Sequence, residues 1–241
     1  MNAPFYDSAR LDVITTYSGG AADNVRGSVA NTSESKIQEN YRQFYEKTYE
    51  GIRANAPIAL ADDSDKNQYI ITEHYTMPGV WHTNDKGKKV LDVFARSVYE
   101  RLTDPSALPA GAPMALPYPR NFNYTIDIKM PEEWVFPTRA WHVKTDSYEF
   151  SFRPEVFGRR ITLQYSLETF KDHVPPEEIA QYKRDYKRMV ELLEFELSYG
   201  YDNASSPGTG NTDPDTEKIL KDYKNYKNVP WGIIAFVVFL F

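Results

Sequence analysis

Hydrophobic and polar side chains alternate without a break between residues 121 and 130. The apolar positions are Phe122, Tyr124, Ile126, Ile128 and Met130, and the polar ones are Asn121, Asn123, Thr125, Asp127 and Lys129. A period of two predicts a β-strand with one buried and one solvated face. Pro117 and Pro119 mark its start, because proline cannot donate a hydrogen bond to a sheet. We expect this strand, within residues 114–130, to be the centre of an antiparallel sheet.

Four other segments have the alternation or the β-rich composition of strands. They are residues 11–17, 68–77, 148–153 and 161–168. The last two are joined by residues 154–158, which have the length of a hairpin loop. Residues 90–102 are apolar at mixed spacing and suit a strand followed by a helix. The sequence therefore predicts an α+β fold with an antiparallel β-sheet or small β-sandwich and flanking helices.

Helical spacing begins near the N-terminus. Residues 21–29 suit a short helix, and a second helix is expected from Ser35 to Gly51. Ser35 would cap it with Gln38 as the capping-box partner, and Gly51 is a natural stop. Its apolar stripe consists of Ile37, Tyr41, Phe44 and Thr48. We interpret this stripe as core packing.

The longest predicted helix follows residue 172. Pro175 and Pro176 would occupy its first turn, with acidic residues next to them at the positive end of the helix dipole. Its buried stripe would be Ile179, Tyr182, Tyr186, Met189, Leu193 and Leu197. Gly200 would end it, so that one long amphipathic helix closes the β domain.

Composition and net charge argue against several classes of function. The chain has 241 residues, 28 Lys and Arg against 34 Asp and Glu, and a formal net charge of −6. This balance, without any basic run, argues against nucleic acid as a partner. Cysteine is absent, which excludes a disulfide, a thiolate metal site and a cysteine nucleophile. The aromatic content of 15% suits sheet surfaces.

Candidate chemistry is sparse. The four histidines, His74, His82, His142 and His173, have no metal-motif spacing, so each is expected to be a structural hydrogen-bonding residue. The acidic stretch at residues 61–65 lacks the glycine and the spacing of an EF-hand loop, and is expected to be a solvated loop. Nucleotide-binding glycine motifs and the G-x-S-x-G elbow are also missing. We therefore predict no catalytic, cofactor-binding or metal-binding residue, and no cofactor.

The C-terminal stretch is apolar. No charge occurs from Trp231 to Phe241, and at about 1.5 Å per residue this run reaches about half of a hydrocarbon core. We expect residues 229–241 to begin a transmembrane helix, truncated here, which would make membrane lipid a partner. A buried strand is the alternative, since Ile233 and Val237 suit either. Residues 201–228 are expected to be a flexible linker and a polar segment.

Four segments in this order carry a family resemblance: V-I-T-T-Y-S-G-G-A-A-D-N-V-R, Y-I-I-T-E-H-Y-T-M-P-G-V-W, M-A-L-P-Y-P-R-N-F-N-Y-T-I-D-I and L-E-T-F-K-D-H-V-P-P-E-E-I-A-Q-Y-K-R-D. Together they resemble the C-terminal part of bacterial transglutaminase-like proteins, over about residues 11–197. Such proteins have an N-terminal β domain of unknown function, a papain-like core and a C-terminal β domain. Their core uses a cysteine nucleophile with His and Asp, so the resemblance implies that this chain is a non-catalytic fragment.

The resemblance also implies a domain organisation. Residues 1–52 would correspond to the tail of the core, and residues 53–200 to the antiparallel β domain. The family favours an extracytoplasmic domain on a membrane anchor. The lysines before the apolar tail conflict with this, because positive charge favours the cytoplasmic side. They are Lys218, Lys221, Lys224 and Lys227.

Three functions follow as hypotheses. The first is an accessory structural or interaction domain of a membrane-anchored transglutaminase-like protein. The second is a carbohydrate- or peptide-binding module at the cell envelope, with a protein or cell-wall partner. It would use a stacking surface of Trp81, Tyr118, Trp134 and Trp141, whose alternative role is core packing. The third is an enzyme, for which His74 or His142 would have to meet carboxylates in one concave pocket.

Overall fold

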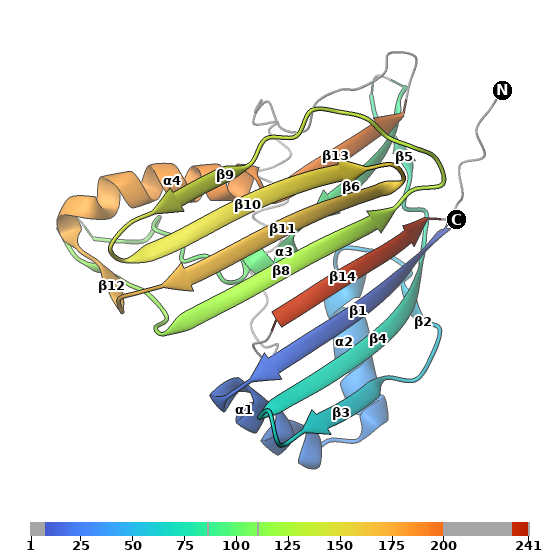
Figure 1. Ribbon diagram of the computed structural model, residues 1–241, viewed down its shortest axis with the longest axis horizontal. Coiled ribbons are helices and arrows are strands. Elements are labelled where there is room, and N and C mark those ends of the chain that lie inside the picture. Colours follow the sequence, from blue (N-terminus) through green and yellow to red (C-terminus); the bar gives the residue numbers. More distant parts are fainter. Residues whose placement is uncertain (1–7, 86, 110, 200–232, 241) are drawn as a thin grey trace.

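The computed structural model describes residues 8–85, 87–109, 111–199 and 233–240. The large sheet consists of β1 (Ser8–Ser18), β2 (Arg53–Ala54), β3 (Ala59–Asp63), β4 (Gln68–Pro78), β8 (Arg120–Lys129), β9 (Trp141–Lys144), β10 (Tyr148–Phe157), β11 (Arg160–Thr169) and β14 (Ile233–Leu240). Their order is β2-β4-β1-β14-β8-β11-β10-β9, with β3 paired to β4 (Figure 1). The fold is mostly antiparallel β-sheet with a few helices, which confirms the expected α+β character.

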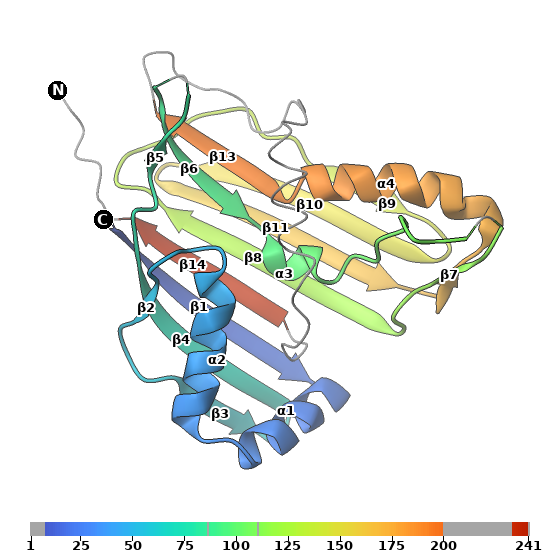
Figure 2. The same cartoon turned by 180° about the vertical axis from the view of Figure 1, so that it is seen from behind.

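A smaller sheet has the order β13-β6-β5. It is built from β5 (His82–Thr83), β6 (Lys89–Phe94) and β13 (Glu194–Tyr199), while β7 (Met114–Ala115) pairs with β12 (His173–Val174). The helices are α1 (Gly20–Ala30), α2 (Glu34–Glu46), α3 (Arg96–Tyr99) and α4 (Ile179–Glu191), with a 3₁₀ turn at Pro176–Glu178. Figure 2 shows the helices and the small sheet on one face of the large sheet. The opposite face is left uncovered by these elements.

Strand register ties distant parts of the chain together. β1 pairs with β4 along its whole length, from Ser8 opposite Pro78 to Ser18 opposite Gln68. The predicted segments 1–52 and 53–200 therefore share one sheet. β8 is antiparallel to β11 and parallel to β14, and it lies near the middle of the sheet, as expected for the central strand.

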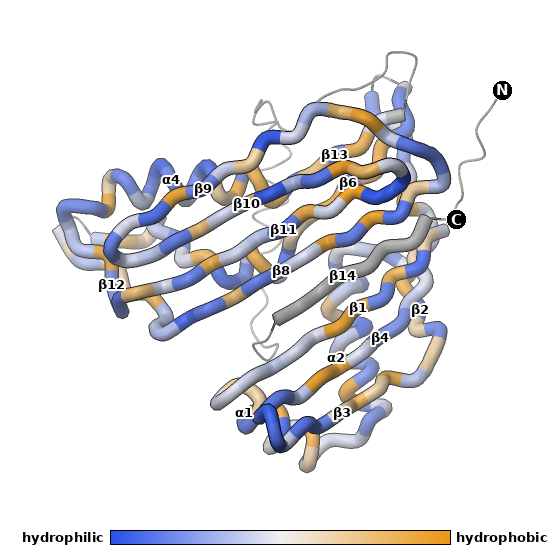
Figure 3. Tube along the Cα trace, in the orientation of Figure 1, coloured by the Kyte–Doolittle hydropathy of each residue, from blue (hydrophilic) through white to orange (hydrophobic). Residues whose placement is uncertain are grey.

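The core lies between the large sheet and the elements on its covered face. Its main part spans β8, β10, β11, the small sheet and α4, and a second cluster lies beneath α1 and α2. Figure 3 shows the alternation of hydrophobic and polar residues along β8, β10 and β11 that places one face of each strand in this core. Leu163 and Ile161 on β11 are fully buried. The alternation of apolar and polar residues in the sequence therefore corresponds to the alternation of buried and more exposed side chains along these strands.

The start of α2 differs from the prediction. The helix begins at Glu34, and its N-cap is Ser33, whose side chain accepts a hydrogen bond from the backbone of Lys36 at 3.4 Å. The predicted capping box of Ser35 and Gln38 is wrong, because the Gln38 amide donates to the carbonyl of Ala56 at 2.8 Å. Ser33 has the extended backbone that a cap needs, which allows Glu34 to occupy the first turn.

The long C-terminal helix is also shorter than predicted. α4 ends at Glu191, and residues 194–199 form β13, which pairs with β6. Leu193, Phe195 and Leu197 are buried at a spacing of two, so they fit a strand better than the helical stripe. Hydrogen bonding to the neighbouring strand β6 favours the strand over the helix for these residues.

The acidic stretch at residues 61–65 is solvated, as expected, but only its second half is a loop: Asp62, Ser64 and Asp65 are exposed, and residues 64–67 form a turn. Residues 59–63 form β3, and the Asp62 carboxylate accepts hydrogen bonds from the Arg26 guanidinium at 2.8 and 2.9 Å. The Asp63 carboxylate forms an ion pair with Lys66 at 2.8 Å. These partners hold the pKa of both carboxyl groups below the usual value.

The apolar tail is extended where it is described. Backbone pairing places Ile233–Leu240 as β14 between β1 and β8, which corresponds to the strand alternative. β-Branched residues favour extended backbone. The predicted linker at residues 201–228 lies outside the described residues. None of the described helices has the length and apolarity to cross a membrane, and membrane anchoring stays a prediction.

Candidate functional site

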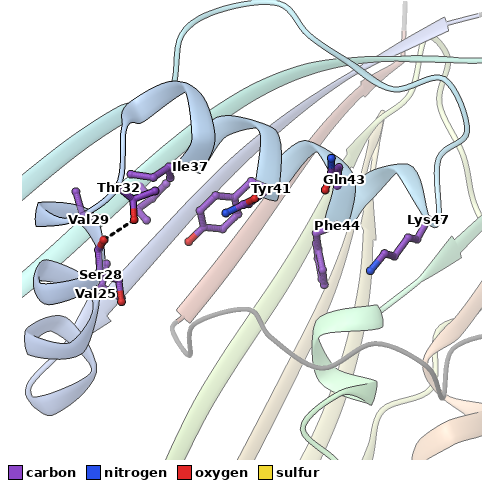
Figure 4. A pocket seen from close by; sticks show the side chains of 11 residues that line it. Val25, Ser28, Val29, Thr32, Ile37, Tyr41, Gln43, Phe44 and Lys47 are labelled. Carbon is purple, nitrogen blue, oxygen red and sulfur yellow. Dashed lines mark hydrogen bonds between the residues drawn. The ribbon is translucent and has the colours of Figure 1, made fainter.

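A cavity of about 400 Å³ opens between α1, α2 and the large sheet (Figure 4). Its lining residues are Val25, Ser28, Val29, Thr32, Ile37, Asn40, Tyr41, Gln43, Phe44, Lys47 and Ile71. α1 and α2 both bury apolar side chains towards the sheet, among them Val25 and Ile37, which also line the cavity. Because the two helices are joined by only a short turn after Ala30, their facing side chains come from nearby sequence.

The walls combine apolar surface with a few hydrogen-bonding groups. Thr32 donates its hydroxyl proton to the carbonyl of Ser28 at 2.9 Å, and the Gln43 amide donates to Glu39 at 2.7 Å. The carboxamide of Asn40 also lines the cavity. Burial and the nearby guanidinium of Arg96 lower the pKa of Lys47 at the end of α2. Polar and apolar side chains thus line the cavity in similar numbers, so it offers both hydrogen bonds and apolar contact.

Tyr41 lines the cavity and is paired with a second buried phenol, that of Tyr17 on β1. The hydroxyl oxygens of Tyr17 and Tyr41 lie 3.1 Å apart, and both rings are buried. Burial raises the pKa of Tyr17 to about 12 and that of Tyr41 further. Both phenols are therefore neutral at physiological pH, and their hydrogen bond links α2 to β1.

A buried carboxyl group lies on β4, two residues from the cavity-lining Ile71. Glu73 is 2% exposed, and its Oε1 atom has no hydrogen-bond partner, while Tyr75 donates to its Oε2 atom. Burial raises the pKa of Glu73 to about 8, although the bond from Tyr75 opposes this. The hydroxyl of Thr15, diagonally opposite on β1, is buried and unpartnered too. Two polar atoms are thus left unsatisfied on one buried patch of sheet, which is costly in a protein interior.

Glu73 was missed by the sequence reasoning, although a signal for it exists. It lies on the same face of β4 as Tyr69, Ile71 and Tyr75, all buried, so a carboxyl group interrupts an otherwise apolar stripe. Ile71 lines the cavity and is two residues from Glu73. A charged side chain on the apolar face of a strand is rare unless it is paired or neutral.

The four histidines are not brought together. Each lies beside one carboxylate: His74 with Asp12 at 2.5 Å, His82 with Asp92 at 3.4 Å, His142 with Glu149 at 2.8 Å and His173 with Asp172 at 2.7 Å. None of them lines the cavity. Within the described part of the chain, no three His, Asp or Glu side chains form a group that could hold a metal ion. The concave His–carboxylate pocket required by the enzyme hypothesis is therefore not formed by His74 or His142 at this cavity.

The expected stacking surface is only partly exposed. Trp81, Trp134 and Trp141 are half-buried and pack against the main core, whereas Tyr118 is 55% exposed. The ring of Trp141 lies 5.8 Å from that of Phe150. Three of the four rings therefore take the core-packing role that was the alternative.

Comparison of the sequence with protein-family models gives no match. Searches of curated proteins and of solved structures likewise find no significant similarity.

Proposed function

We propose that this chain is a non-catalytic binding domain of a membrane-anchored, transglutaminase-like protein, placed outside the cytoplasm. Its ligand is an apolar peptide segment, which binds in the cavity between α1 and α2. The family assignment rests on the four ordered sequence segments, and the binding role rests on the cavity. The cavity is the single observation that carries the proposal.

Three properties of the cavity support a peptide ligand. Its volume of about 400 Å³ falls in the range of ligand pockets, roughly 300–1,000 Å³. Val25, Val29 and Ile37 offer apolar contact to side chains. Asn40 and Gln43 carry carboxamides, which have the donors and acceptors that a peptide backbone requires. The phenol of Tyr41 in the lining is neutral and poorly nucleophilic, because burial raises its pKa, and this fits binding better than reaction.

Calorimetric titration with acetylated hexapeptides tests this role. One set is rich in leucine, valine and phenylalanine, and the other in serine, glutamate and lysine. We expect saturable binding of the apolar set alone. Val29→Trp places an indole in the cavity and should weaken binding by at least about tenfold, because the ring excludes the ligand. Val135→Trp, at an exposed loop position, is the matched control and should bind as the wild type does.

Equal binding of both peptide sets, or equal affinity of the Val29→Trp and Val135→Trp variants, would remove the cavity from the proposal. Hydrolysis or transamidation of peptide amides by the purified chain would contradict the non-catalytic role. The peptide-binding role and the non-catalytic role can therefore be contradicted independently of each other.

A further inference from the structure

The contact between α2 and the large sheet, which we call the α2 interface, contains a carboxyl group among several phenols. α2 lies on the covered face of the sheet (Figure 2). The hydroxyl oxygen of Tyr41 on α2 lies 3.1 Å from that of Tyr17 on β1. The ring of Tyr45 on α2 lies 5.3 Å from that of Tyr75 on β4. Glu73 belongs to this interface, because it accepts a hydrogen bond from Tyr75 and its charge adds to the effect of burial in raising the pKa of Tyr45.

The α2 interface favours the protonated form of Glu73. Among the described residues, Glu73 takes part in none of the ion pairs, and its Oε1 atom accepts no hydrogen bond. A buried carboxylate that lacks a cation is costly, so the group keeps its proton instead. Burial accordingly raises the pKa of Glu73 to about 8. Loss of the proton places a negative charge directly beneath α2.

The other charged groups near the interface act on its phenols. Arg101 acts on Tyr17, and its guanidinium donates to the carbonyl of Ser97 at 2.6 Å. Arg42 and Glu39, on α2, act on Tyr75 with opposite sign and are bound to each other at 2.8 Å. Burial raises the pKa of every phenol in and beside the interface, so these side chains stay neutral where Glu73 titrates: Tyr17, Tyr41, Tyr45, Tyr75 and Tyr124.

α2 is the element that can move away from this charge. β4, which carries Glu73, is paired along its whole length with β1 and on its other side with β2 and β3. Among the described residues, the backbone of α2 forms hydrogen bonds only within the helix and the turns at its ends. Side chains hold it in place, including the Tyr41 hydroxyl and the Gln38 amide, which donates to the carbonyl of Ala56 at 2.8 Å. An element held by side chains opens more readily than a paired strand.

We propose that protonated Glu73 keeps α2 on the sheet, and that release of this proton to solvent frees α2 and with it one wall of the α1–α2 cavity. Tyr41 and Phe44 project from α2 into that wall (Figure 4). Because Tyr41 belongs to both the α2 interface and the cavity lining, movement of α2 changes the cavity directly. The cavity therefore holds its ligand at neutral pH and loses it in alkali. The loss of ligand rests on the proposed peptide-binding role, whereas the release of α2 does not.

The sign of the effect follows from the two pKa values. Glu73 on a freed α2 interface has the ordinary glutamate pKa of about 4.3, and in the closed interface its pKa is about 8. Between them, each unit of pH raises the ratio of freed to bound α2 about tenfold. The effect of the proton is fully present below the lower value and is lost as pH rises through the higher one.

Distances between spin labels test the release of α2. Because the chain has no cysteine, labels attach only to introduced ones. Glu46→Cys/Ser18→Cys joins exposed positions on α2 and β1, and Lys183→Cys/Ser18→Cys joins α4 to the same strand as the control. Pulsed electron paramagnetic resonance measures both pairs at about pH 6 and about pH 9. We expect the short α2 distance to lose at least about fivefold in population at the higher pH, and the α4 distance to stay constant.

Variants at Glu73 assign the change to its proton. Glu73→Gln cannot ionise and should keep the short α2 distance at both pH values. Glu73→Met, with an apolar side chain of similar length, is a second variant without a titrating group. Glu155→Gln, at an exposed position on β10, is the matched control and should change as the wild type does. An unchanged α2 distance in the wild type, or an equal change in the Glu73 variants, would overturn the proposal.

Calorimetric titration with the apolar hexapeptides connects α2 to the ligand. Wild-type affinity should fall at least about fivefold between the same pH values, because apparent affinity scales with the fraction of molecules that can bind. The affinity of Glu73→Gln should stay constant. Absence of peptide binding at both pH values, with the change in α2 distance intact, would contradict the peptide-binding role alone. Constant wild-type affinity despite release of α2 would place the peptide outside the cavity.

Discussion

The hydroxyl group of Tyr75 donates a hydrogen bond to the carboxyl group of Glu73, two residues away on the same buried face of β4. Tyr45 on α2 packs over this pair, with its ring 5.3 Å from that of Tyr75. Burial raises the pKa of Glu73 to about 8, so the carboxyl group is mainly protonated at neutral pH. The Glu73–Tyr75 pair is therefore uncharged at neutral pH, and it becomes charged when Glu73 loses its proton at higher pH.

Stability should fall as pH rises because of Glu73. The folded protein keeps the proton up to about pH 8, whereas the unfolded chain releases it near the ordinary glutamate value of about 4.3. Between these two pKa values the folded state binds more protons than the unfolded state. The contribution of Glu73 to stability is therefore fully present below the unfolded-state pKa and is lost as pH rises through the folded-state pKa. Thermal unfolding of the wild type and of Glu73→Gln measures this effect. Between about pH 5 and pH 8, we expect the wild-type Tm to fall by at least about 5 °C more than that of the variant.

Glu155→Gln, an exposed position on β10, is the control for that experiment and should follow the wild-type profile. Parallel profiles for the wild type and Glu73→Gln would contradict a protonated Glu73.

Asp127 should have the opposite pH dependence. Burial opposes its ionisation, but hydrogen bonds from Arg160 at 2.6 Å and Thr162 at 2.8 Å outweigh this and lower its pKa. The stabilisation is present above the ordinary aspartate pKa of about 3.9 and is lost as pH falls through the lower folded-state value. Asp127→Asn should cost about 1–3 kcal/mol in the free energy of unfolding at neutral pH. Urea titrations at several pH values should show this difference shrinking in acid; a constant difference would argue against ionic pairing.

The phenol pair of Tyr17 and Tyr41 should behave as a coupled unit. Either Tyr→Phe change removes the hydrogen bond between the two buried hydroxyls, which costs about 1–3 kcal/mol. The double change removes the same hydrogen bond only once, so its cost should be smaller than the sum of the single costs. Denaturant unfolding of all four proteins in the cycle measures the coupling, with exposed Tyr118→Phe as control. Additive costs would show that the 3.1 Å contact carries no net energy.

Leu163 should be a strong determinant of stability. Its side chain is fully buried on β11, between the sheet and the elements on its covered face. Leu163→Ala should lower the free energy of unfolding by about 2–5 kcal/mol, because it loses buried apolar surface and leaves a cavity. Val135→Ala, at an exposed position, should change it by less than about 0.5 kcal/mol. Chemical unfolding compares the two, and similar values would mean that this part of the core is loosely packed.

Local pattern identified most elements correctly. The strands at β1, β4, β8, β10 and β11, the strand–helix order of β6 and α3, and the short helix α1 all lie where alternation and helical spacing predicted them. The prediction from local pattern was wrong where the same residues are compatible with two different structures. Leu193 and Leu197 suit a helical stripe and a strand equally well, and pairing with β6 made the strand. Ser33 and Ser35 are both good caps, and only the backbone geometry selected Ser33.

The sequence by itself determined which face of each strand is buried, because side chains alternate across a strand regardless of its neighbours. The tertiary structure alone decided which strands are neighbours and in what register. Arg10 and Lys129 are aligned across β14 although more than a hundred residues separate them, and Ile71 on β4 meets side chains of α1 and α2 at one cavity. Such relations depend on backbone pairing between distant segments. Pairing of this kind leaves no periodic signal in the local sequence, so neither the cavity nor the alignment of Arg10 with Lys129 could be predicted from it.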